Sequence, residues 1–551
     1  MKIPIGHYQR EEFYTDLITR AFESRTDRIA LYDGLKNYYL WGQTSFTEPV
    51  VYNKLYAHID LLASFLFSGE TTSFVIEVDE DETTSFYELE TQKAKRLTSA
   101  LNRAWGRSNL DIVFNEALIW ALVFNSMFIK MVPRKKDQFD CYVVEPHSIG
   151  VLLEQEPMLD KQPCIVHEFY MTRSDLESRV SALSEKDQKM ILGMVTFQSR
   201  TIDATTTPSP TGVQNLILAT TEPNIQGNIV NPIATQYDFN PRITEECCIA
   251  QEVWIWDNDQ KDYRMAVMLE GTFLLHDCMG NPFVSNELPF IKITPDQIYN
   301  YFWGRTEMMY LIPIQEWVNE RIPEIKKHLQ KQTNPPRSAS GFSGYSDEKS
   351  FAALDNPGGT VFEPTPIPGK IEPLFPANIN VFDILDRAEQ MFAEVSGIRE
   401  LMQGKGEAGV RAMSHANLLV RVGSSRVKKK ASILEDAVEK IGYLILKIMQ
   451  KYDDSHYKTD KETSFTAKQL TDNCVVKVDS HSSSPIFVEQ QIDKAELLFK
   501  AGAIDREDLI DAVKPQNPGI IKKKLREREL AAAIRQAALD KADIQDSKGK
   551  K

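Results

Sequence analysis

The feature that most restricts the fold of this chain is a Pro- and Gly-rich stretch set between two helix-forming segments. Residues 334–377 hold eight prolines and five glycines, a density that no helix tolerates. Apolar residues recur at three- and four-residue spacing before it, in 306–332, and after it, in 381–402. The pattern predicts two helices joined by turns and short strands such as 360–362. Pro313 and Pro323 lie inside the first helix, and we expect each to kink or interrupt it.

The rest of the second half continues this alternation. Residues 404–409 contain three glycines and end the second helix, and 411–452 then predicts a long helix. A Gly-Ser-Ser sequence at 423–425 is a place where that helix is expected to bend. A short strand at 474–478 and a further helical region at 485–544 complete the chain.

The first 300 residues change from a helical to a β period near residue 140. Helical spacing runs through 11–39, 52–67, 91–105 and 111–124. Short β-like runs follow, separated by polar turns, and 197–241 is predicted to be a long loop or insertion. The runs are 141–144, 151–153, 164–170, a hairpin of 247–256 with 263–276, and 289–293. The predicted fold class is therefore α+β.

Composition narrows the class of protein. The chain has 551 residues and a formal net charge of −14, which argues against a protein that coats nucleic acid but not against one that lets DNA pass. No secretory signal is expected at the start. The most apolar stretch, 117–132, is interrupted by Asn125, Ser126 and Lys130, so it predicts a buried element and not a membrane span.

Searches for catalytic and metal-binding motifs give no candidate site. The six cysteines have no C-x-x-C spacing and are expected to be small buried residues in a reducing compartment. The nine histidines show no paired ligand spacing, and residues 404–406 lack the remainder of a phosphate loop. Gly341-Phe342-Ser343-Gly344 is one spacer short of a nucleophile elbow. We therefore predict no catalytic residue, no metal and no cofactor.

The order of the elements, with several short phrases, carries a family resemblance. Trp303-Gly304-Arg305-Thr306 precedes the first hairpin helix, Val395-Ser396-Gly397-Ile398 leads to 401–404 at the end of the second, and Gly502-Ala503-Ile504-Asp505 lies near the C-terminus. Over about residues 31–518 the chain resembles the portal proteins of tailed phages, the head-to-tail connector family, in a podophage-like form. The two prolines in the first hairpin helix depart from that pattern.

The resemblance implies a portal fold with a mixed helical and β wing, a two-helix stem, a Pro/Gly-rich clip, a long kinked helix and a C-terminal helical crown. The implied parts are a wing at 1–300, β-rich over 140–295; a first stem helix at 301–333; a clip at 334–378; a second stem helix at 379–403; a tunnel loop at 404–415; the long kinked helix and return to the wing at 416–480; and the crown and C-terminal tail at 481–551.

The resemblance also implies a function that is not enzymatic. A portal is a homododecameric ring at one capsid vertex of the virion, assembled in the host cytoplasm, through which double-stranded DNA enters and leaves. Its implied partners are the terminase large subunit, the major capsid and scaffolding proteins, and tail adaptor proteins, with no membrane. Two alternatives stay open, namely another virion head–tail adaptor or structural protein, and a nucleic-acid-processing enzyme.

Two sets of residues are candidates for binding. Between residues 411 and 430 there are six Lys or Arg and no Asp or Glu, so these side chains and their neighbours are candidates for phosphate contact in a DNA channel. They equally suit a solvated face, or pairing with acids of neighbouring subunits. The DNA-channel candidates are Lys405, Arg411, His415, Arg421, Arg426, Lys428, Lys429 and Lys430. Aromatic residues in the Pro/Gly-rich stretch are candidates for partner binding at the clip: Phe342, Tyr345, Phe351 and Phe362.

Overall fold

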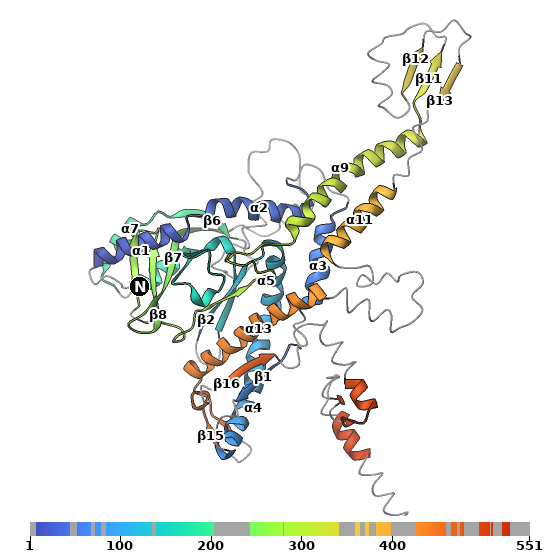
Figure 1. Cartoon of the computed structure of the whole chain (residues 1–551). Helices are drawn as coiled ribbons and strands as arrows, with labels where there is room; N and C mark the ends of the chain where they lie inside the picture. The colour runs from blue at the N-terminus through green and yellow to red at the C-terminus, as the bar shows by residue number, and fades with distance from the viewer. Residues whose placement is uncertain are drawn as a thin grey trace, which may run out of the picture.

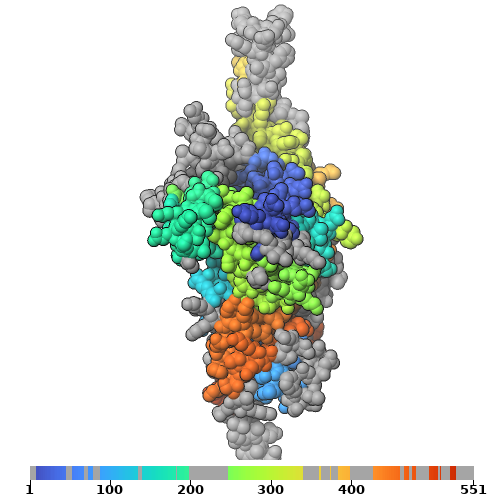
Figure 2. All heavy atoms as spheres, turned by 90° about the vertical axis from the view of Figure 1, so that its left-hand side faces the viewer, coloured from blue at the N-terminus to red at the C-terminus, as the bar shows by residue number. Residues whose placement is uncertain are grey.

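The structure is a computed structural model of the chain, and it confirms a mixed α and β architecture. It describes residues 7–44, 52–67, 72–78, 84–134, 139–181, 183–202, 243–278, 280–340, 359–363, 370–373, 382–397, 425–458, 464–470, 474–478, 495–506, 509–510 and 521–528. A body of sheets and helices carries a helical hairpin that projects from one end (Figures 1 and 2).

The larger sheet of the body is antiparallel and has six strands in the order β4-β5-β7-β8-β9, with β6 paired to the start of β7. Helix α1 (His7–Ala21) packs Tyr14 and Leu17 against one face of it, and α6 (Arg173–Val180) and α7 (Glu185–Met194) cover one end. The strands are β4 (Ile149–Val151), β5 (Cys164–Thr172), β6 (Gln198–Ile202), β7 (Ile243–Asp257), β8 (Asp262–Leu269) and β9 (Phe273–Asp277).

Ionic contacts tie α1 to this sheet. The carboxylate of Asp277 accepts hydrogen bonds from Arg264 at 2.7 and 2.8 Å and from Arg10 of α1 at 2.7 Å. A second set of polar contacts is buried. In it, Lys130 pairs with Glu252 of β7 at 2.7 Å and approaches Nδ1 of His167 of β5 at 3.3 Å. Burial, and then the charge of Lys130, hold the pKa of His167 well below its ordinary value.

A second sheet follows from an abrupt change of conformation in the apolar stretch 117–132. Helix α5 (Leu110–Phe124) ends at Asn125, whose φ of +69° turns the chain into β2 (Met127–Pro133). Asparagine tolerates this left-handed conformation better than the branched residues around it. Strand β2 pairs with β3 (Phe139–Val144) and β10 (Phe290–Ile293). The prediction of a buried element is confirmed, although it is two elements and not one.

Helices and a two-stranded sheet surround the largest hydrophobic core. The helices are α2 (Arg25–Trp41), α3 (Lys54–Leu66), α4 (Thr84–Arg107), α5 and α13 (Ser425–Tyr452). Strands β1 (Phe74–Val78) and β16 (Cys474–Val478) pair antiparallel although they lie 400 residues apart in sequence. Short elements complete the body: η2 (Pro146–Ser148), η3 (Leu159–Lys161), η5 (Ala467–Gln469), β14 (Tyr457–Lys458) and β15 (Ser464–Phe465).

The projecting hairpin consists of α9 (Met308–Thr333) and α11 (Phe382–Ser396), which lie side by side (Figure 1). At its end is a small three-stranded sheet in the order β12-β11-β13. Strand β11 (Arg337–Ser340) runs parallel to β12 (Thr360–Glu363) and antiparallel to β13 (Lys370–Pro373). The predicted helix–strand–helix order is confirmed for the described residues.

Of the predicted kink or interruption at each proline, the interruption does not occur, because one helix runs through Pro313 and Pro323. Both prolines lie on its exposed side, whereas the buried positions, such as Leu311 and Val318, lie on the other. Each proline leaves a carbonyl one turn earlier without its helical partner. On the exposed side water can bond that carbonyl, so the helix continues.

Other boundaries differ from the predictions in detail. The helical stretch 11–39 is two helices, α1 and α2, and 198–202 of the predicted insertion form β6. On α11 the buried face uses Ala388 and Phe392, while Met391 and Val395 are more than 40% exposed. The strand at 474–478 is confirmed. None of the six cysteines, all of which the structure describes, forms a disulfide; four are buried and two half-buried.

Candidate functional site at the root of the hairpin

Most of the predicted binding residues lie outside the described residues. These are Lys405, Arg411, His415, Arg421, Phe342, Tyr345 and Phe351. Phe362 is in β12, opposite Ala339 of β11. Arg426, Lys428, Lys429 and Lys430 are in the first turns of α13, and of these Arg426 and Lys429 are exposed.

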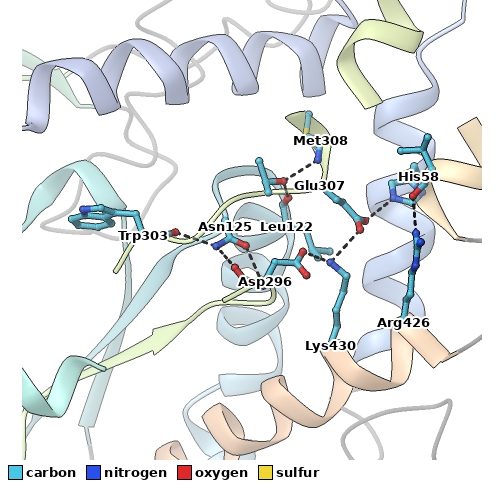
Figure 3. A network of polar contacts seen from close by, with 11 residues as sticks. His58, Leu122, Asn125, Asp296, Trp303, Glu307, Met308, Arg426 and Lys430 are labelled. Atoms are coloured by element: carbon cyan, nitrogen blue, oxygen red, sulfur yellow. Dashed lines mark hydrogen bonds and ion pairs between the residues drawn. The ribbon is translucent and has the colours of Figure 1, made fainter. Parts of the chain in front are cut away.

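Lys430 points into the protein and not toward solvent. Its side chain is 8% exposed, and its ammonium group pairs with the carboxylates of Asp296 and of Glu307, the latter at 3.1 Å (Figure 3). Two acids within the same subunit therefore already bind the charge of Lys430, and its contact with DNA stays a prediction.

Glu307 joins three elements at the start of α9. It is the residue before the helix, and its carboxylate contacts Lys430 of α13 and, at 2.8 Å, the ring nitrogen Nε2 of His58 in α3. Burial alone would raise the pKa of Glu307. The hydrogen bond with His58 and the charge of Lys430 together lower the pKa by more, so it lies below the ordinary value. The carboxylate therefore stays charged at neutral pH.

Asn125 holds the Trp303-Gly304-Arg305-Thr306 phrase in place through hydrogen bonds to the backbone of Trp303 and of Asp296. Its amide Nδ2 donates to the carbonyls of Asp296 at 2.8 Å and Trp303 at 3.0 Å, and its Oδ1 accepts from the Asp296 amide. Gly304 has a φ of +66°, and a Cβ at that position would lie 1.8 Å from Asn125 Nδ2. A glycine is required there on both counts.

The remaining side chains of the phrase anchor it further. Thr306 donates to the carbonyl of Leu122 at 2.6 Å and accepts from the amide of Met308, the first residue of α9, at 3.2 Å. The Trp303 indole donates to Glu154 at 2.9 Å, and the Arg28 guanidinium lies 3.9 Å above the indole ring. Such contacts hold the strand-to-helix connection in one orientation.

The second phrase, Val395-Ser396-Gly397-Ile398, meets α13 at the same place. Arg426 donates to the carbonyl of Val395 at 2.9 Å. Gly397 has a φ of +72°, and a Cβ there would lie 2.8 Å from Cδ of Arg426. The end of α11 is therefore bound to the start of α13, next to the Glu307 contacts (Figure 3). We call this whole set of contacts the hairpin junction.

Sequence reasoning found the two phrases but missed their partners. His58, Asn125, Asp296 and Glu307 come from distant parts of the chain, and no local pattern distinguishes them from other polar residues. Chemically, the junction binds and orients: it ties α3, α9, α11 and α13 together at the root of the hairpin through charged groups, of which Lys430 and His58 are buried.

Within the part of the chain that the structure describes, no three or more His, Cys, Asp or Glu side chains are grouped as a metal site would require. No helix among the described residues is long and apolar enough to cross a bilayer.

Comparisons with known proteins give weak structural likenesses. No protein-family model matches the sequence, and no curated protein matches it significantly. A solved "Neck of empty GTA particle computed with C6 symmetry" is similar with a TM-score of 0.40 and 10% identity, over 89% of this chain and 93% of that one. The "Virion of native gene transfer agent (GTA) particle" gives 0.39 and 8%, over 89% and 93%. The "Neck of native GTA particle computed with C12 symmetry" gives 0.35 and 9%, over 83% and 88%. TM-scores below 0.5 do not define a shared fold.

Proposed function

We propose that this chain is a portal subunit, which forms a ring around double-stranded DNA at one vertex of a tailed-phage capsid. The observation that supports this best is the hairpin of α9 and α11. It leaves the body, ends in a separate sheet and is rooted in the hairpin junction (Figure 1). In this proposal the hairpin is the stem, the sheet at its end belongs to the clip, and the body is the wing.

The dimensions of the hairpin suit a part that reaches a partner at a distance. Helix α9 has 26 residues, which at about 1.5 Å per residue extends roughly 40 Å. Its buried positions lie mostly in the first half, and from Lys326 to Thr333 its side chains are exposed or half-buried. The end of the hairpin therefore stands clear of the body, where a packaging motor can bind first and tail adaptors later.

The hairpin junction suits a part that carries mechanical load. Force applied at the clip reaches the body through the start of α9 and the end of α11, and both are fixed by charged contacts to α13. We infer that a homododecameric ring of such subunits transmits that force to the capsid. The work of DNA translocation would come from the terminase, so the chain itself need not be an enzyme.

This proposal does not rely on DNA contact by Lys430, whose charge two acids already bind. The other basic candidates, from Lys405 to Lys429, remain proposals, and a ring would repeat each of them into a belt of positive charge. Particles that carry Lys405→Ala with Arg411→Ala should package less DNA or retain it less well. Normal yield and normal retention would remove these two residues from the channel.

The test of the proposed function is electron microscopy of the purified chain in negative stain, with mass photometry alongside. We expect rings with a central hole and a mass about twelve times the 62.8 kDa of the chain. A deletion of residues 341–351 should leave the rings intact and abolish binding of the terminase large subunit. Rings that bind terminase equally well without those residues would contradict the clip assignment, and a chain that stays monomeric would contradict the portal itself.

A further inference from the structure

A groove of about 570 Å³ lies on the body where α13 passes β10 and β16. Strand β10 forms one wall, β16 the other, α13 the floor and the segment around Asp160 one end. Figure 2 shows a face on which the region of the large sheet (green) lies next to the region of α13 (orange). The two walls are edge strands, because β10 pairs only with β2 and β16 only with β1 among the described strands.

The wall formed by β16 turns the backbone groups of Val476 and Val478 away from β1, and the amide of Val478 donates to Glu439 of α13 at 3.0 Å. On β1, the amides of Phe74 and Ile76 face away from β16 and are capped by Asn102 and Thr98 of α4 at 2.9 and 3.1 Å. In an antiparallel pair the residues opposite them therefore also face outward. The backbone of Val476, opposite Ile76, faces the groove. It has no partner within the described part of the chain.

The wall formed by β10 also turns backbone groups toward the groove. The amide of Met131 donates to the carbonyl of Pro289 at 2.8 Å, which directs every second residue from Pro289 toward β2. Phe290 and Lys292 lie between those positions, so their backbone groups face the groove. A strand edge left open in this way is a template for association with another chain.

Acidic groups dominate the charge of the groove. Asp436 and Glu439 of α13 line it with Asp160. Lys440 is bound to Asp160 at 3.3 Å. Burial and the nearby charge of Lys440 lower the pKa of Lys292 to about 7, so this lysine offsets the acids only in part.

The opposite edge of the β1–β16 pair carries the complementary charge. It is covered by α4, whose outer face presents Arg96, Ser99, Arg103 and Arg107 at helical spacing, all exposed. Residues 91–110 contain no Asp or Glu. The β1–β16 pair therefore has a groove rich in hydrogen-bond acceptors on the β16 side and a helix face rich in hydrogen-bond donors on the β1 side.

We propose that the groove receives the outer face of α4 from a second copy of this chain, in a head-to-tail contact. Arginine donors of the incoming helix meet Asp436, Glu439 and the outward carbonyls of the strand edges. The same helix already caps a strand edge inside its own chain through Thr98 and Asn102. A head-to-tail contact that repeats around an axis closes into a ring, so this inference rests on the proposed function and assigns the surfaces that build it.

A charge exchange tests the contact on the full-length chain. Asp436→Arg and Arg103→Glu each place like charges in the groove, and each should raise the concentration at half-assembly about tenfold or more. The double variant restores opposite charges and should return that concentration to within about threefold of wild type. Lys189→Glu on α7, an exposed charge far from the groove, is the matched control. Mass photometry over a concentration series gives the readout, and circular dichroism checks that each variant is folded.

The outcomes separate this inference from the function on which it rests. If wild type forms rings and the single reversals assemble at unchanged concentration, the groove contact is refuted and the ring stands. If both single reversals weaken assembly and their effects add in the double variant, the two charges do not face each other, and the proposed pairing of surfaces is refuted. If wild type stays monomeric throughout, the ring itself is refuted, and the contact with it.

Discussion

Replacing Lys430 by methionine tests how strongly the hairpin junction holds α9. The substitution keeps most of the side-chain volume and removes the charge that two carboxylates share. Breaking a buried ion pair typically costs about 3–5 kcal/mol because the remaining charge is left uncompensated. Here Asp296 is 37% exposed and regains water, and Glu307 keeps its hydrogen bond to His58. We therefore expect a loss of about 2–3 kcal/mol in the free energy of unfolding.

A second substitution shows whether that loss comes from the ion pair. Once Lys430 is methionine, Glu307→Gln removes the carboxylate that has lost its partner, so it should cost less than it does in wild type. The coupling between the two changes should be about 1–3 kcal/mol. Lys429→Met, which removes the exposed neighbouring charge, is the control and should change stability by less than about 0.5 kcal/mol.

The measurements are urea denaturation and amide hydrogen exchange in the first turns of α9. The pKa of Glu307 is lower in the folded protein than in the unfolded chain, where it is about 4.3. The charged Glu307 carboxylate therefore stabilises the folded protein above the pKa of the unfolded chain, and this stabilisation is lost as the pH falls through the pKa of the folded protein. The difference in the free energy of unfolding between wild type and Lys430→Met should become smaller below about pH 4. Additive substitutions, or a difference in the free energy of unfolding that stays the same as the pH falls from 7 to well below 4, would refute the reasoning.

Three further predictions concern the body. Gly304→Ala should cost about 3 kcal/mol or more in thermal unfolding, whereas Gly106→Ala in α4, where the added methyl meets open space, should be neutral or stabilise by up to about 1 kcal/mol. The pKa of His167 is lowered on folding, so the unfolded chain takes up a proton at a higher pH than the folded protein does. The free energy of unfolding of wild type should therefore fall by up to about 1.4 kcal/mol per pH unit below about pH 6.5. His167→Phe should flatten that slope, and an unchanged slope would exclude His167 as its source. Asp277→Asn should release α1, which would appear as faster amide exchange over residues 7–21 with little change in β7. Equal exchange in wild type and in Asp277→Asn would show that apolar packing alone holds the helix.

Much of the local structure was predictable from the sequence because its causes are local. The density of proline and glycine in 334–377 excludes a helix whatever surrounds it, and apolar spacing of three and four residues marks the flanking helices. The positions of β16 and the β7–β8 hairpin follow from short-range alternation in the same way. For these elements no knowledge of distant contacts is needed.

The tertiary structure alone decided the properties that depend on distant partners. Whether Pro313 breaks α9 depends on which side of the helix is buried, and Lys430 resembles Lys429 until Asp296 and Glu307 are brought beside it. The pairing of β1 with β16 joins segments 400 residues apart, and no local pattern specifies it. A charge pattern in sequence shows which side chains could bind a phosphate. Only packing shows which of them are already bound, because burial makes an internal partner compulsory for a charged group.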